Sequence, residues 1–269
     1  MKLYQLLFEA AKSPEDAIES ELGLFVIRHE KEVVVVLIST TRCEEIVESY
    51  NAITSASMAR IDFRQTWLSK MIGKRAVIGS VVAEEADPNV WRVSTSVAVA
   101  KYGPMLYDVI MGLIYPAYLR SDYSLTDESR NVWNKMLQRK DVEAVSVDKV
   151  GYGDDPVQAL ESSFEVADLT SDAADQKEYE LDNMNRVPKD WFKKFVESLP
   201  PEDKEKLGPF YAYRKKTGKN LSKYNKLLDA GDDIVGMFEA SLDLEKKHVE
   251  DAITIASRNM FERLYEVHQ

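Results

Sequence analysis

Four consecutive residues, Lys101-Tyr102-Gly103-Pro104, have the types and spacing best suited to binding an anion. They lie between residues 90–97, whose alternation predicts a strand, and residues 105–113, whose apolar stripe has helical spacing. Pro104 fits the first turn of a helix, and Gly103 permits a tight backbone. A glycine turn from a strand into a helix directs free N–H groups and the positive helix end to one point. An ordinary strand–turn–helix packing unit has the same pattern, so both interpretations stay open.

The elements that must position this loop follow from the apolar periodicity of residues 1–150. Ser13-Pro14-Glu15-Asp16 is typical of a helix start, with an N-cap, a proline and an acidic first turn. Strands are expected at 23–28, 32–40, 75–83, 90–99 and 142–147, and helices at 41–50, at 105–113 and after Thr126; residues 84–89 are expected to form a hairpin turn and residues 115–118 a short strand or turn. We predict an α/β (α+β) domain with a mixed, mainly antiparallel sheet flanked by helices, in which residues 33–37, 77–82 and 93–99 are central strands.

The second half of the chain changes character. Residues 151–182 contain ten acidic side chains and one lysine, which predicts an extended acidic linker over 151–187 because such a segment buries little apolar area. Residues 188–269 are predicted to be a helical C-terminal region, with apolar stripes over 188–199, 220–228 and, as one long helix, 232–267. These helices must pack on each other, on residues 1–150 or on a partner subunit.

Composition excludes several classes of protein. Of the three histidines none has ligand spacing, and Cys43 is the only cysteine, so an intrachain disulfide is impossible and we expect no metal site. The net charge of −11 argues against general nucleic-acid binding. No apolar run reaches the length of a membrane span, and the N-terminus lacks the pattern of a signal peptide, so we expect neither membrane insertion nor secretion.

A basic run in the second half leaves a phosphate contact open. Arg214-Lys215-Lys216 is followed by Lys219, Lys223 and Lys226, and tyrosines at 211, 213 and 224 are interleaved with them. Such a run could hold a nucleic-acid strand, or it could be a solvated face that offsets the acidic linker.

Two stretches resemble the GNAT (Gcn5-related N-acetyltransferase) superfamily, and more narrowly the divergent acetyltransferase-like proteins of tailed bacteriophages. They are STSVAVAKYGPMLYDVIM and LRSDYSLTDESRNVWNKMLQRKDVEAVSVD, at residues 94–111 and 119–148. The resemblance covers residues 1–150. It implies acetyl-CoA as cofactor, with its pyrophosphate held by amides of the loop after the fourth strand and its pantetheine arm on the splayed strand.

The resemblance assigns the cofactor site to the strand end and the loop, namely Val97, Val99, Lys101, Tyr102, Gly103, Pro104 and Met105. Gly103 matches the last glycine of the family pattern. Lys101 stands at the preceding glycine, and Ala98 at the family's Gln or Arg. Trp133 lies near the position of the tyrosine that protonates the leaving thiolate, and an indole N–H cannot do this. Tyr123 and Tyr102 are the substitutes that the sequence offers.

Two functions remain at this stage. One is an N-acetyltransferase in which an amine attacks acetyl-CoA directly, with Asp122 or Glu84 as the base and Tyr123 as a further catalytic candidate. The other is a catalytically inactive GNAT-fold protein, a structural (virion) or host-interaction component of a phage, since fold does not imply function. Either places the protein in the host cytoplasm or the virion, with a second copy or a phage or host protein bound through the C-terminal helices.

Overall fold

The sheet that organises the chain has seven strands in the order β1-β2-β3-β4-β5-β7-β6. The structure is a computed structural model that describes residues 11–53, 61–87, 89–99, 101–121, 127–146, 211–216, 218 and 221–266. The strands are β1 (Leu22–Arg28), β2 (Glu32–Ser39), β3 (Val77–Asp87), β4 (Val90–Ala98), β5 (Tyr118–Arg120), β6 (Val142–Ser146) and β7 (Tyr211–Lys215). Only β4 and β5 pair in parallel; all other pairs are antiparallel. The prediction of a mixed, mainly antiparallel sheet is confirmed.

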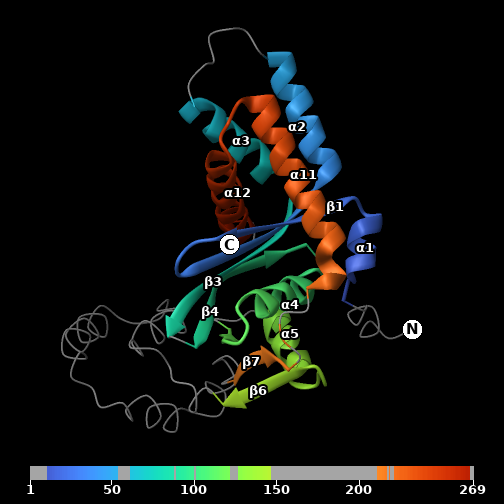
Figure 1. Cartoon of the computed structure of the whole chain (residues 1–269), viewed down its shortest axis with the longest axis vertical. Helices are drawn as coiled ribbons and strands as arrows, with labels where there is room; N and C mark the ends of the chain where they lie inside the picture. The colour runs from blue at the N-terminus through green and yellow to red at the C-terminus, as the bar shows by residue number, and fades with distance from the viewer. Residues whose placement is uncertain are drawn as a thin grey trace, which may run out of the picture.

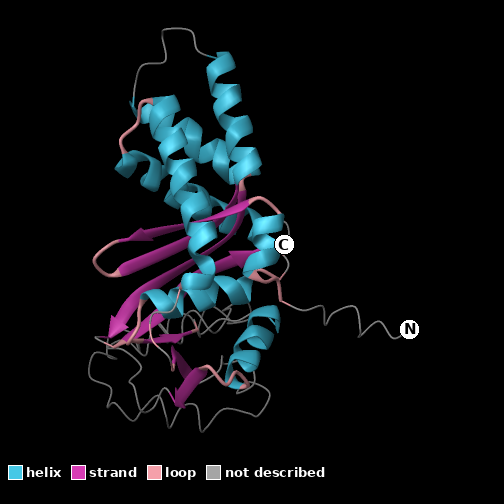
Figure 2. Ribbon diagram, turned by 45° about the vertical axis from the view of Figure 1, so that its right-hand side comes forward, coloured by secondary structure: helices cyan, strands magenta, loops and turns pink. Residues whose placement is uncertain are grey.

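Helices cover both faces of this sheet (Figures 1 and 2). One face carries α4 (Gly103–Leu113) and α5 (Asp127–Leu137), and the other carries α2 (Thr40–Ile53), α3 (Ile61–Arg75) and α12 (Lys246–Glu266). The remaining helices are the short α1 (Pro14–Glu19), the 3₁₀ turn η4 (Ser222–Tyr224) and α11 (Asn225–Leu242). None of the helices in the described ranges is long and apolar enough to cross a membrane.

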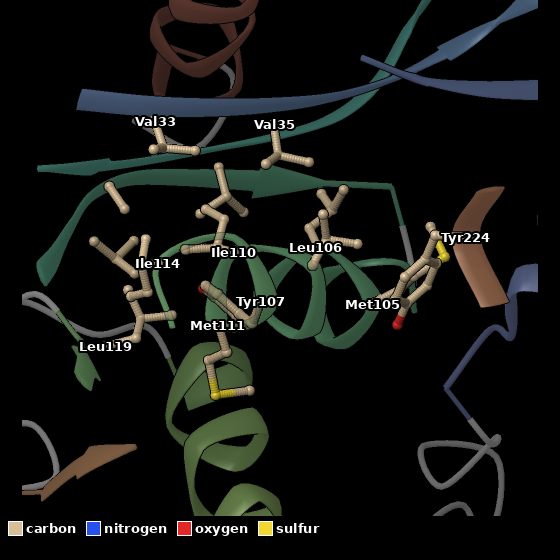
Figure 3. Packing of buried hydrophobic residues seen from close by; sticks show 14 of the residues in the cluster. Val33, Val35, Met105, Leu106, Tyr107, Ile110, Met111, Ile114, Leu119 and Tyr224 are labelled. Atoms are coloured by element: carbon tan, nitrogen blue, oxygen red, sulfur yellow. The ribbon is translucent and has the colours of Figure 1, made fainter. Parts of the chain in front are cut away.

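Alternation along β2 divides the core into two apolar clusters. Seven of its eight residues are buried, and successive side chains point to opposite faces. Val33 and Val35 pack on the α4 side, where Leu106 and Ile110 meet them in Figure 3, and Val34 and Val36 pack on the α2 side. A strand apolar on both faces requires helices on both faces, so this one sequence feature fixes three layers.

The C-terminal part of the chain completes the same sheet. Strand β7 pairs with β5 on one side and with β6 on the other, so residues 211–215, expected to be helical, form a strand. The single helix expected over 232–267 is also wrong, because α11 ends where Asp243 adopts φ 51° and ψ 50°. Aspartate tolerates this left-handed conformation better than most residues, so no glycine or proline marks the break.

Helix α11 covers the edge of the sheet at β1 and reaches both apolar clusters. Its Leu227 packs in the α4 cluster and its Phe238 in the α2 cluster. The crossing is close, since a Cβ on Gly231 would lie 2.2 Å from the Leu24 carbonyl oxygen. A glycine is therefore required there, and the otherwise open edge strand is covered.

Other expectations have mixed outcomes. The N-cap at Ser13 is confirmed, since its hydroxyl accepts from the Asp16 N–H. The Asp16 carboxylate also accepts from the Ser13 N–H, which makes the cap a capping box. The hairpin turn expected over 84–89 is too long, because β3 continues to Asp87 and β4 begins at Val90. The acidic linker over 151–187 and the helix over 188–199 lie outside the described residues.

Candidate functional site

The candidate cofactor loop joins β4 to α4, as the sequence predicts. Lys101 has φ +82°, a conformation that glycine adopts without strain, and α4 begins at Gly103 with Pro104 in its first turn. A Cβ on Gly103 would meet nothing within 4 Å. The backbone at this point is therefore open on the side of the missing Gly103 side chain.

Most N–H groups of this loop already donate hydrogen bonds to backbone carbonyls. The Tyr102 N–H donates to the Val99 carbonyl at 3.3 Å, and the N–H groups of Met105 and Leu106 donate to the Tyr102 carbonyl at 3.1 and 3.2 Å. Pro104 has no N–H. The sequence predicts a cleft that the amides of residues 102–106 face. Instead three of these N–H groups bond within the loop and the first helical turn, and only that of Gly103 has no backbone acceptor among the described residues.

The side chains assigned to the cofactor site are divided between the core and the surface. Tyr102 and Met105 are buried in the α4 cluster, so their side chains do not line an open site. Val99 is exposed, and Val97, Lys101 and Pro104 are half-buried. A ligand beside Gly103 would therefore contact Val97, Val99, Lys101 and Pro104.

Strand β4 opens beside the loop. Its pairing with β5 ends at Arg92 with Arg120, and no described strand pairs with that side of β4 beyond it. A β-bulge follows at once, since Ala83 pairs with Val93 but Val82 pairs with Thr95. A bulge bends and twists its strand, so β4 changes direction just beyond its last pair with β5.

The open edge of β4 presents backbone groups. The Val99 N–H donates to the Ile78 carbonyl of the β3 side at 2.8 Å, and the ladder directs alternate residues to that side. Ser96 and Ala98 consequently direct their N–H and C=O groups away from β3. The Ser96 hydroxyl accepts from the Tyr107 hydroxyl at 2.7 Å, which joins β4 to α4 below the open edge.

Of the three predicted catalytic residues, the structure describes Glu84 alone. Glu84 lies within β3 rather than at a strand end, and its carboxylate is 3.6 Å from the Arg92 guanidinium of β4. Asp122 and Tyr123 lie outside the described residues. Trp133 is fully buried between the rings of Tyr107 and Tyr213, at 4.8 and 5.1 Å between centroids, so it is a core residue.

A buried charge cluster around Asp108 was not predicted. Asp108 lies in α4, its side chain is 3% exposed, and its Oδ1 is 2.5 Å from Lys215 Nζ and 2.6 Å from an Arg139 amino group. Its Oδ2 accepts from the Tyr224 hydroxyl at 2.7 Å and lies 2.9 Å from Lys223 Nζ. One carboxylate thus joins α4 to the start of β6, the end of β7 and η4.

Burial and pairing act in opposite directions on this carboxylate. Burial alone would raise the pKa of Asp108, but hydrogen bonds from Lys215, Tyr224 and Lys223 and the charge of Arg139 outweigh it, and the pKa is far below its usual range. Burial, together with the Asp108 charge, raises the pKa of Tyr224. Hydrogen bonds from Arg139 lower the pKa of Asp141 to about 2. The two carboxylates of the cluster are therefore held in their charged forms at neutral pH.

A weak signal for this cluster exists in the sequence. Asp108 is the only charged residue between Lys101 and Arg120, in an apolar helix. A buried carboxylate must be paired, which predicts a cation but not which one. Its partners lie 31 to 115 residues later in the chain, so periodicity could not have identified them.

The basic run after residue 211 is largely committed inside the fold. Lys215 and Lys223 bind Asp108, and the Arg214 guanidinium binds the Glu143 carboxylate at 2.7 Å. Tyr213 and Tyr224 are buried. The run is therefore neither a row of aromatic rings open to nucleotide bases nor a fully solvated face.

Cys43 and metal ligands contribute no site. Cys43 is completely buried, and burial raises the pKa of its thiol to about 12, so it is not a nucleophile at neutral pH. The residues that the structure describes contain no group of three or more His, Cys, Asp or Glu side chains placed to hold a metal ion.

Comparison of the chain with protein-family models, with curated proteins and with solved structures finds no match.

Proposed function

We propose that this chain is a GNAT-like protein that binds acetyl-CoA along the open edge of β4 and transfers the acetyl group to an amine, as a phage-encoded N-acetyltransferase-like protein. The observation that carries the proposal is the edge of β4 beyond Arg92, which no described strand covers after β5 ends at Arg120 and which leads past a bulge to Gly103. An extended ligand can pair with the N–H and C=O groups of Ser96 and Ala98 as a strand would.

The conformation of the loop supports the same proposal. Lys101 stands where the family pattern has a glycine, and its φ of +82° is one that glycine adopts readily. Gly103 stands at the pattern's last glycine and leaves open space where a side chain would be. The Gly103 N–H and the positive end of α4 are then available to one phosphate group.

The proposed chemistry is a direct transfer. The amine nitrogen attacks the thioester carbonyl carbon, the C–S bond breaks, the amine loses a proton to a base, and the thiolate gains one. The chain contributes orientation and backbone N–H groups for the thioester oxygen. Glu84 is the described candidate for the base, beside Arg92, the last residue of β4 that pairs with β5, and Asp122 is the alternative.

A second candidate function is a catalytically inactive protein of the same fold that binds a phage or host protein, or a second copy, in the virion or the host cytoplasm. The consumed amides of Tyr102, Met105 and Leu106 favour it, because they leave one N–H where a pyrophosphate needs several. The buried Trp133, which replaces a proton donor, favours it as well.

Ligand stabilisation of the full chain distinguishes the two. Acetyl-CoA should raise the thermal midpoint of the wild type, because a ligand that binds only the native state stabilises it. Gly103→Glu should abolish the shift, since it places a carboxylate against the pyrophosphate, whereas a glutamate in a first helical turn is compatible with folding.

The matched control is Gly236→Glu. Gly236 lies in α11, and it too has nothing within 4 Å of an added Cβ. It should retain the acetyl-CoA shift. A wild type with no shift at saturating acetyl-CoA would refute the enzyme and leave the interaction protein.

A further inference from the structure

Cationic side chains outnumber carboxylates around Asp108. Arg139, Lys215 and Lys223 pair with the carboxylates of Asp108 and Asp141. Lys216 lies beside them, since its backbone N–H donates to the Asp141 carbonyl at 3.0 Å. These six side chains carry a net charge of +2, within a chain whose net charge is −11. The excess charge is local, and it lies where α4, β6, β7 and η4 meet.

The cations differ in how many of their N–H donors are not bound to a carboxylate. Lys215 is 9% exposed and lies between Asp108 and Asp141. Lys223 is 48% exposed and contacts only Asp108 among carboxylates, so two of its three N–H donors point elsewhere. Lys216 is exposed; its Nζ donates to the Lys140 carbonyl at 2.9 Å, and its charge also acts on the nearby Glu143 carboxylate.

Arg139 also retains donor capacity. Its Nε and one amino group bind Asp141, and that amino group also reaches Asp108. Its other amino group reaches only the Met136 sulfur, at 3.6 Å, which is a weak acceptor. The arginine is fixed in place by the two carboxylates while one face of its guanidinium remains uncommitted.

We propose that Arg139, Lys216 and Lys223 form a binding site for a phosphate group. A phosphate dianion matches the surplus charge of +2, and its oxygens accept from ammonium and guanidinium groups together. Asp108 and Asp141 orient the cations but do not neutralise them all. A lone carboxylate ligand would leave one charge unmatched.

Two sources of such a phosphate are compatible with the site. Asp108 lies about 7–8 Å along α4 from Gly103, within the reach of a nucleotide bound at that helix start. One source is therefore the 3′-phosphate of coenzyme A, which rests on the proposed function. The other is a separate oligophosphate, which does not.

The experiment uses inorganic triphosphate, CoA and dephospho-CoA as probes on the full chain, with the thermal midpoint and a titrated dissociation constant as readouts. Triphosphate should bind at low ionic strength and weaken with added salt. Lys216→Ala and Lys223→Ala should each weaken it by about two- to fivefold, the range for an exposed ion pair. Lys247→Ala, an exposed lysine of α12, should leave it unchanged.

The outcomes separate the sources. CoA binding more tightly than dephospho-CoA, with the difference lost in Lys216→Ala, assigns the site to the 3′-phosphate. Triphosphate binding with no CoA binding supports the site and refutes the proposed function. CoA and dephospho-CoA binding equally, with triphosphate insensitive to both lysine variants, refutes the site and leaves the proposed function standing. Lys216→Ala keeps the test valid if Lys223→Ala unfolds the chain, because Lys216 does not touch Asp108.

Discussion

Asp108→Asn should be the most damaging near-isosteric substitution in the described part of the chain. It keeps the shape of the side chain and removes the only charge that compensates Lys215 from within α4. The side chains of Lys223 and Arg139 are 48% and 27% exposed and can turn toward water. Losing either ion pair with Asp108 therefore costs about 0–1 kcal/mol. Lys215, at 9% exposure, cannot.

The magnitude follows from that one buried cation. Removing one partner of a buried pair costs about 3–5 kcal/mol. Asp141 lies 3.5 Å from Lys215 Nζ and compensates part of the charge, so about 3 kcal/mol is expected. A typical domain has about 5–15 kcal/mol of unfolding free energy, so the variant should fold but with a much lower midpoint.

Urea unfolding followed by tryptophan fluorescence measures this change. Trp133 of α5 is buried against Tyr107, which lies next to Asp108 in α4. The control is Asp232→Asn, at an exposed position of α11, which should alter the free energy of unfolding by less than about 0.5 kcal/mol. A loss below about 1 kcal/mol for Asp108→Asn would refute the reasoning, since it would mean that Lys215 is hydrated without the carboxylate.

Three further predictions follow from single features. Gly231→Ala should lower the free energy of unfolding by about 2–3 kcal/mol, because a Cβ would overlap a β1 carbonyl. Gly236→Ala, where an added Cβ meets open space, should raise it by about 0.5–1 kcal/mol. The denaturant midpoints of both variants test this pair of predictions. Lys101→Gly should be more stable than Lys101→Ala by about 0.5–1 kcal/mol, since only glycine relieves φ +82°, and equal midpoints would contradict the strain. Folding lowers the pKa values of Asp108 and Asp141, so the stability that these two carboxylates contribute is complete above about pH 4. It is lost as the pH falls toward the folded-state pKa values, about 2 for Asp141. The thermal midpoint measured against pH should show this loss, and Asp141→Asn should make the loss smaller.

The sequence predicted the sheet well where periodicity is local. Seven buried residues in β2 and the strand-to-helix change at Gly103 are visible in the order of apolar residues alone. It failed where the fold depends on distant contacts. No local pattern shows that residues 211–215 insert between β5 and β6, or that Asp243 ends a helix without glycine or proline.

In the candidate site, too, local features could be predicted from the sequence and distant contacts could not. The position of the loop was predictable, because glycine and proline between two periodicities mark a turn. The use of its amides was not, since it depends on how the first turn of α4 closes on Tyr102. The Asp108 cluster was missed because one acid meets cations from three other segments, and a single sequence does not show that meeting.

The insertion of β7 between β5 and β6 has a consequence for how the protein is made. A ribosome that adds about 5–20 residues per second needs several seconds to pass from the end of β6 at Ser146 to the start of β7 at Tyr211. During that interval β5 and β6 have no strand between them, and Asp108 lacks Lys215 and Lys223. Until then Arg139 is the one cation of the cluster that can pair with Asp108, and the full set of ion pairs beside α4 forms only after residue 223 has emerged.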